Sequence, residues 1–126
     1  MMSDELFEAK VDEVCAVDTR YDPDAYFFLR EGMDFAIKER KGGKQQHLSG
    51  KELSEGLRDY ALAEFGPMAL FVLTEWGLRS TADFGNLVYN LIHAEVFTKT
   101  STDKRADFNN VFDFHQAFAV PYLPEK

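Results

Sequence analysis

The chain has 126 residues, which fits one domain spanning residues 1–126 and buries roughly two thirds of its unfolded surface without needing a disulfide or a metal. Hydrophobic residues make up 45%, including twelve Phe and five Tyr, so disorder is excluded and an aromatic-rich core is expected. The formal net charge of −8 disfavours nucleic acid and anionic membrane surfaces as partners. Residues 1–40 hold eleven of the 22 acidic and five of the 14 basic side chains, which places most negative charge on the N-terminal helices.

The compartment is indicated by three features. Cys15 is the single cysteine, so no internal disulfide is expected. Met1–Glu5 lacks the basic and apolar regions of a signal peptide. The longest apolar run, Pro67–Leu73, is too short to cross a bilayer. We therefore expect a cytoplasmic protein without membrane contact.

A first helix is predicted over residues 4–17. Phe7, Val11 and Val14 recur at the spacing of one helical face. Cys15 lies beside this stripe and is expected to be a small buried hydrophobe. A reactive thiolate would need a cationic neighbour, whereas the local sequence is acidic.

A second helix is predicted to begin at Asp22, which suits a cap, with Pro23 in the first turn and Asp24 at the positive end of the helix dipole. Residues 40–46 then form a polar, basic loop. The apolar face of this helix consists of Tyr26, Phe28, Leu29, Met33, Phe35 and Ile37.

The third helix is predicted from a capping box, Ser49 with Glu52 three residues later. It ends at Gly66-Pro67, where a fourth helix over residues 67–76 begins. The fourth helix is apolar nearly all round, so we expect it at the centre of the domain. The inward residues of the third helix are Leu53, Leu57, Tyr60 and Ala61.

A fifth helix is predicted after a tight turn at Gly77, which supplies a positive φ. Ser80 and Asp83 form a second capping box, and the helix runs to about Glu95. Its apolar stripe consists of Phe84, Leu87, Val88, Leu91 and Ile92.

A C-terminal β hairpin is predicted next. Residues 96–100 are rich in β-formers, residues 101–105 make a polar turn, and residues 108–114 form a returning strand. The fold class is therefore mainly α, within α+β, with about five helices and this small hairpin. One interpretation of residues 67–114 is a winged helix-turn-helix, and the alternative is a helical bundle with a terminal hairpin.

A polar, uncharged face of the fifth helix lies opposite its apolar stripe. DNA readers combine Arg or Lys for phosphates with polar base contacts, and this helix carries neither Lys nor Arg. A protein interface suits the face better. The alternatives are that it is solvated, or that the N-terminal helices of the same chain cover it. The candidate interaction face consists of Gly85, Asn86, Tyr89, Asn90 and His93.

The sequence predicts no catalytic, cofactor-binding or metal-binding residue. His47, His93 and His115 lie far apart, and none has a second ligand type at helical spacing of i+3 or i+4. Phosphate-binding glycine loops and a nucleophile elbow are absent. The tripeptide at 83–85 spells a kinase motif, but no other kinase element accompanies it.

The chain also resembles a small bacterial family of single-domain proteins with no established activity. The resemblance covers nearly the whole chain and implies a bacterial, full-length, single-domain protein, but it transfers no catalytic residue. It is carried by Tyr21–Tyr26 (YDPDAY), His47–Leu53 (HLSGKEL), Glu64–Ala69 (EFGPMA) and Glu75–Gly85 (EWGLRSTADFG).

Three functions follow as hypotheses. The leading one is a non-enzymatic protein-interaction module that binds a partner protein or self-associates. The second is a DNA-associated winged-helix regulator, although nucleic acid is an unfavoured partner of an acidic chain. The third is an enzyme whose site is assembled from residues distant in sequence.

Overall fold

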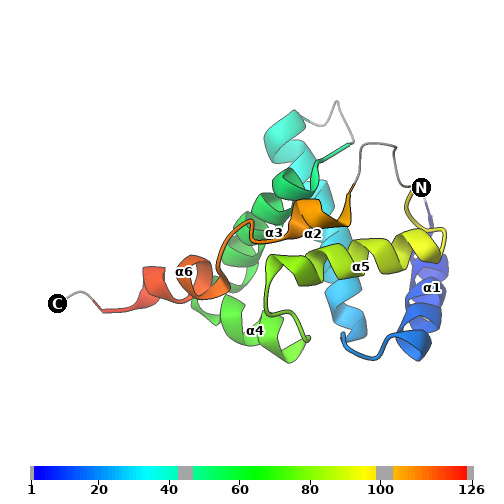
Figure 1. Ribbon diagram of the computed structural model, residues 1–126, viewed down its shortest axis with the longest axis horizontal. Helices are drawn as coiled ribbons and strands as arrows, with labels where there is room; N and C mark the ends of the chain where they lie inside the picture. Colours follow the sequence, from blue (N-terminus) through cyan, green and yellow to red (C-terminus); the bar gives the residue numbers. More distant parts are fainter. Residues whose placement is uncertain (1, 43–46, 99–103, 125–126) are drawn as a thin grey trace.

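The computed structural model describes residues 2–42, 47–98 and 104–124, and this part of the chain is helical and contains no β-strand (Figure 1). The α-helices are α1 (Asp4–Val17), α2 (Pro23–Lys41), α3 (Gly50–Phe65), α4 (Ala69–Glu75), α5 (Thr81–His93) and α6 (Phe114–Phe118). The 3-10 helices are η1 (Gly66–Met68), η2 (Arg105–Phe108) and η3 (Val120–Tyr122). None of the described helices is long and apolar enough to cross a membrane.

The predicted starts of α2 and α3 are confirmed by their caps. The Asp22 carboxylate accepts the backbone N–H of Asp24 at 2.9 Å, and Pro23 occupies the first turn. At α3, Ser49 and Glu52 each accept the other's backbone N–H at 3.1 Å. These bonds satisfy donors that have no partner inside a helix, which fixes where each helix begins.

The core is one cluster to which α1 to α5, η2 and α6 all contribute. Helices α2 and α3 are packed closely, because Gly32 faces Leu57 and Gly56 faces Ala36 with no room for a larger side chain. Helix α5 crosses this pair, with α1 near its C-terminal end and α6 near its N-terminal end (Figure 1). The core residues with the largest fully buried side chains are Tyr26, Phe7, Phe84, Phe118, Leu29 and Leu57.

A helix is present where it was predicted over residues 67–76, but its expected position at the centre of the domain, covered on most sides, was wrong. The segment divides into η1 and the short helix α4, which packs against α3 and α6. It buries Ala69 and Leu73, but the side chain of Phe71 is 58% exposed. A helix of two turns can be covered on one side by two neighbours, so its outer side stays apolar and in contact with solvent.

The predicted C-terminal β hairpin was also wrong, and with it the winged helix-turn-helix over residues 67–114. The backbone N–H groups of Val96 and Phe97 donate to the carbonyl of Leu91, at 2.8 and 3.3 Å, so they close the end of α5 instead of pairing with a strand. Glu95 takes the left-handed conformation, with φ of 65°, that such a helix end requires. Residues 99–103 of the predicted strand and turn lie outside the described residues.

The predicted returning strand is replaced by helical turns. The carboxylate of Asp113 accepts the N–H of Gln116 at 2.9 Å and starts α6. Phe114 and Phe118 then lie one turn apart, with ring centres 5.2 Å from each other. Phe84 of α5 packs on Phe114 at 5.5 Å. The aromatic residues that suggested a strand therefore form a ring cluster that docks α6 on α5.

The connection between α1 and α2 is fixed to the turn between α4 and α5. Gly77 has φ of 91°, and a Cβ at this position would collide with the carbonyl oxygen of Arg20. The N–H of Asp22 donates to the carbonyl of Trp76 at 3.1 Å. Only glycine gives both this backbone conformation and this close approach, so Gly77 holds residues 20–22 beside the start of α5.

We predict that Gly77→Ala destabilises the fold more than Gly42→Ala. Both glycines have positive φ, but a Cβ on Gly42 meets no atom within 4 Å. The Gly42 variant should therefore lose about 1 kcal/mol from backbone strain alone, while the Gly77 variant also has to displace Arg20. Urea unfolding measures both changes, and equal losses would show that the contact with Arg20 is unimportant.

Candidate functional site

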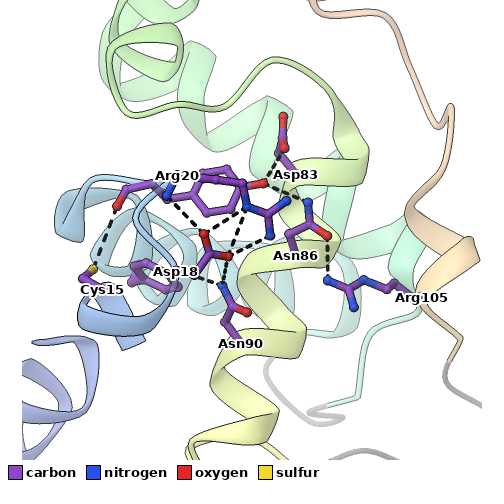
Figure 2. Close-up of polar contacts among 9 residues, drawn as sticks. Cys15, Asp18, Arg20, Asp83, Asn86, Asn90 and Arg105 are labelled. Atoms are coloured by element: carbon purple, nitrogen blue, oxygen red, sulfur yellow. Dashed lines mark hydrogen bonds and ion pairs between the residues drawn. The ribbon is translucent and has the colours of Figure 1, made fainter. Parts of the chain in front are cut away.

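The polar side of α5 faces the α1–α2 connection, residues 18–22 (Figure 2). The buried ring of Tyr21 brings its hydroxyl to α5, where it donates to a carboxylate oxygen of Asp83. The same hydroxyl oxygen accepts from the side-chain amide of Asn86 at 2.8 Å. Asp83 also accepts the backbone N–H groups of Arg79 and Ser80, at 2.8 and 3.2 Å. One carboxylate therefore caps α5 and binds the connection.

A second set of bonds lies one turn further along α5. The amide of Asn90 donates to Asp18 Oδ2 and to the Tyr26 hydroxyl, each at 3.0 Å. Asp18 also accepts from Arg20 Nε and Nη2, the shortest of these bonds being 2.7 Å. The bonds from Arg20 hold the pKa of the Asp18 carboxyl well below its usual range, although burial opposes them. Asp18 is therefore a carboxylate with its hydrogen-bonding capacity largely used.

Both tyrosines of this network are neutral near neutral pH; Tyr21 donates to Asp83, and Tyr26 accepts from Asn90. Burial, followed by the hydrogen bond to Asp83, raises the pKa of Tyr21 to about 12. Burial likewise raises the pKa of Tyr26 to about 12. A phenol that is harder to ionise is a poor general base, so these groups are suited to holding structure in place and not to abstracting protons.

Helix η2 packs on α5 beside the face that contacts residues 18–22, around Gly85 and Tyr89. Arg105 Nη2 donates to Asn86 Oδ1 at 2.7 Å, and its guanidinium lies 5.2 Å from the ring centre of Tyr89. A Cβ on Gly85 would lie 2.9 Å from the Cβ of Phe108, so only glycine allows this approach. The Thr81 hydroxyl donates to the carbonyl of Phe108 at 2.6 Å. These contacts dock η2 directly on α5.

The five residues of the candidate interaction face therefore have different surroundings. Gly85 is buried beneath η2, and the side chains of Asn86 and Asn90 bind the α1–α2 connection. Tyr89 lines a cavity between α3, α5 and η2. His93 is exposed and borders a groove of about 320 Å³ between the C-terminal ends of α1 and α5. For the two asparagines, the contacts match the alternative that the N-terminal part of the same chain covers the face.

The residues that sequence reasoning missed are Asp18, Arg20 and Tyr21. Asp18 and Arg20 are two residues apart, so the sequence could have suggested an ion pair between them. Two asparagines on an uncharged helical face also suggest contact with other polar groups, because asparagine is a poor helix former. Neither signal identifies which segment supplies the contact, since that depends on the turn at Gly77.

Cys15 does not have the surroundings of a reactive cysteine. Burial and the nearby carboxylates of Asp12, Asp22 and Asp18 raise the pKa of the Cys15 thiol, which is opposite to what a reactive cysteine needs. Within residues 2–42, 47–98 and 104–124, no three His, Cys, Asp or Glu side chains converge as a metal site would require. The polar network on α5 is thus a structural joint.

Comparisons with protein-family models, with curated proteins and with solved structures found no match. The resemblance to a bacterial family therefore stays a prediction from the sequence.

We predict that Asp18→Asn destabilises the protein near neutral pH and that the loss shrinks in acid. The folded-state pKa of Asp18 lies below its unfolded value, so its stabilisation is complete above the unfolded pKa of about 3.9 and is lost as the pH falls toward the folded pKa. The difference in unfolding free energy should be about 1–3 kcal/mol at neutral pH.

Urea unfolding of both proteins at about pH 7, 5 and 3 measures this difference. Asp12→Asn is the matched control, because Asp12 is an exposed acid on α1 and should change stability little at any of these values. A loss that is the same at all three values for Asp18→Asn would contradict the role assigned to its charge.

Proposed function

We propose that this protein is a non-enzymatic protein-interaction module that contacts its partner through two stretches, η1 with α4 (residues 66–75) and residues 120–123 after α6. The observation that supports this is the gathering of exposed large apolar side chains on these two stretches. The side chains of Met68 and Phe71 are 53% and 58% exposed, and those of Val120, Tyr122 and Leu123 are 39%, 45% and 55% exposed.

Both stretches adjoin α6, because α4 packs against α6 and η3 follows α6 directly. Single exposed apolar residues are common on protein surfaces, but a group of five on adjoining elements is typical of a binding surface. Phenylalanine, tyrosine and methionine are also the residue types enriched in protein interfaces. Pro67 and Pro121 lie in the 3-10 turns of these stretches and restrict the backbone, which reduces the entropy lost on binding.

Other surfaces support the proposal less well. The asparagines of α5 already hydrogen-bond within the chain, so a partner would have to replace those bonds. Contact with DNA is disfavoured by the net charge of −8 and by the lack of Lys and Arg on α5. Bacterial origin, membership of the family that the sequence resembles and a cytoplasmic location belong to the same proposal and rest on the sequence.

The double variant Met68→Ser with Phe71→Ser tests the proposal. Removing two apolar anchors should weaken partner capture at least about tenfold, because a central interface residue contributes about 1–2 kcal/mol or more. Immobilised protein is incubated with bacterial lysate and the bound proteins are identified by mass spectrometry, while light scattering measures self-association. Circular dichroism checks that the variant is folded.

The matched control is Val17→Ser, which removes an apolar side chain that is 89% exposed on α1. We expect the same partners, or the same assembly, for the wild type and this control, and their loss in the double variant. Equal binding by all three proteins would show that α4 is not the contact surface.

A further inference from the structure

We propose that a hollow lined by aromatic rings, between the N-terminal half of α2, the C-terminal end of α3 and Trp76, binds a small alkylated ammonium cation. The hollow has a volume of about 210 Å³, below the range of about 300–1,000 Å³ that sites for drug-sized ligands occupy, so it suits a group of a few heavy atoms. The proposal goes beyond the interaction module, because neither Met68 nor Phe71 lines this hollow.

Aromatic rings form most of the lining. The ring of the buried Phe28 lies 5.6 Å from that of Tyr60 and 5.7 Å from that of Trp76, measured between ring centres. The other rings of the lining are only partly buried although they pack against the core. Aromatic faces attract cations within about 6 Å of the ring centre, and a group in so small a hollow lies near several rings at once. The five rings are those of Phe27, Phe28, Tyr60, Phe65 and Trp76.

The margin of the hollow is negatively charged. Asp24, Glu31 and Glu64 complete its lining, and all three side chains are exposed. The structure records no ion pair for any of these carboxylates among the described residues. No Lys, Arg or His of this part of the chain lines the hollow. The charge of the lining therefore matches a cation and opposes an anion.

The effect of these carboxylates is seen at Tyr60, in the wall of the hollow. The Tyr60 hydroxyl donates to Glu31 Oε2 at 2.9 Å. Burial first, and then this hydrogen bond and the negative charges of Glu31 and Glu64, raise the pKa of Tyr60 to about 12. The same two charges that disfavour a phenolate at this position favour a cation beside it.

An alkylated ammonium group combines the two properties that this lining requires. Its alkyl groups can lie against the rings, while its positive charge is attracted by the rings and by the carboxylates, as in other aromatic sites for quaternary ammonium groups. A bare ammonium group is strongly hydrated and would have to lose more water to lie against the rings.

The fold holds the walls of the hollow in place before a ligand arrives. A Cβ on Gly32 would collide with Leu57 and lie 3.3 Å from the ring of Tyr60, so α2 and α3 pack closely and Tyr60 is held against α2. The backbone N–H of Asp22 donates to the carbonyl of Trp76 at 3.1 Å, which holds Trp76 beside the start of α2. A site with preformed walls loses less entropy on binding.

Other hollows between the described helices lack this combination of rings and carboxylates. The one of about 620 Å³ beside α1 and α2 has the cation Arg30 in its wall. Arg30 is bound to Asp4 at 3.1 Å and does not line the aromatic hollow. The groove of about 320 Å³ beside His93 has no Phe, Tyr or Trp in its lining.

The experiment compares choline chloride with the neutral alcohol in which a tert-butyl group replaces the trimethylammonium group. Each is titrated into the full-length protein at constant ionic strength, with sodium chloride as the balancing salt. The indole ¹H–¹⁵N signal of Trp76, the single tryptophan of the chain, reports binding. Choline should shift this signal saturably and bind at least about fivefold more tightly than the alcohol, because the two molecules share a shape and only choline is attracted as a cation.

Two variants test the carboxylates and the rings separately. Glu64→Gln should weaken choline binding about two- to fivefold, as expected for an exposed ion pair, and should leave binding of the alcohol unchanged. Phe65→Leu removes a ring but keeps an apolar side chain, and should weaken choline binding by about the same factor. The matched control is Glu39→Gln, which removes an exposed acid of α2 outside the hollow and should change neither affinity.

Absence of a saturable shift with choline would overturn the proposal, as would equal affinities for choline and the alcohol. Choline binding as tight in Glu64→Gln as in the wild type would also contradict it. Because Glu64 is exposed, this variant keeps the test valid if circular dichroism shows that Phe65→Leu is unfolded. These measurements do not depend on Met68 or Phe71, so they can fail or succeed separately from the interaction module.

Discussion

The hydroxyl of Tyr21 is the contact on which the arrangement of the other elements depends. It lies between the Asp83 carboxylate and the Asn86 amide, and its ring is 4% exposed. Because Asp83 also accepts the backbone N–H groups that start α5, the cap of one helix and the path of the α1–α2 connection share one acceptor. A hydrogen bond to a charged group contributes more to stability than a neutral one, and this partly buried bond ties α5 to the connection between α1 and α2.

This joint explains why the exposed-looking side of α5 carries no charge. Asparagine amides can donate and accept at once, and Asn86 does so between Tyr21 and Arg105. Lysine or glutamate at this position would favour the helix but would lose one of the two contacts. Contacts within the chain therefore account for Gly85, Asn86 and Asn90 of the face that suggested an interface, while His93 stays exposed. The surface that we propose for a partner is the exposed apolar one of η1, α4 and residues 120–123.

The helix starts were predictable from the sequence, because a cap depends on residues within one turn, as at Ser49 and Glu52. The C-terminal region was not, because Val96 and Phe97 suit a strand as well as a helix end, and their use depends on the carbonyl of Leu91. Phe71 shows why burial was harder to predict than helix starts. The sequence indicates that an apolar helix packs against other elements, but not how many of its sides they cover. For the contacts between α5 and residues 18–22, the composition of α5 indicated that another segment covers its polar face. The sequence did not reveal that Tyr21 makes this contact, because its position depends on the turn at Gly77, which has a positive φ.

The most direct test of this account is a double-mutant cycle between Tyr21→Phe and Asp83→Ala, with unfolding free energies measured in urea. Phenylalanine keeps the buried ring, and the cycle subtracts the loss of the Asp83 cap that both Asp83 variants share. If the hydrogen bond joins the α1–α2 connection to α5, the coupling free energy should be at least about 1 kcal/mol. A coupling near zero, with each single variant losing stability independently, would contradict the central role of this contact.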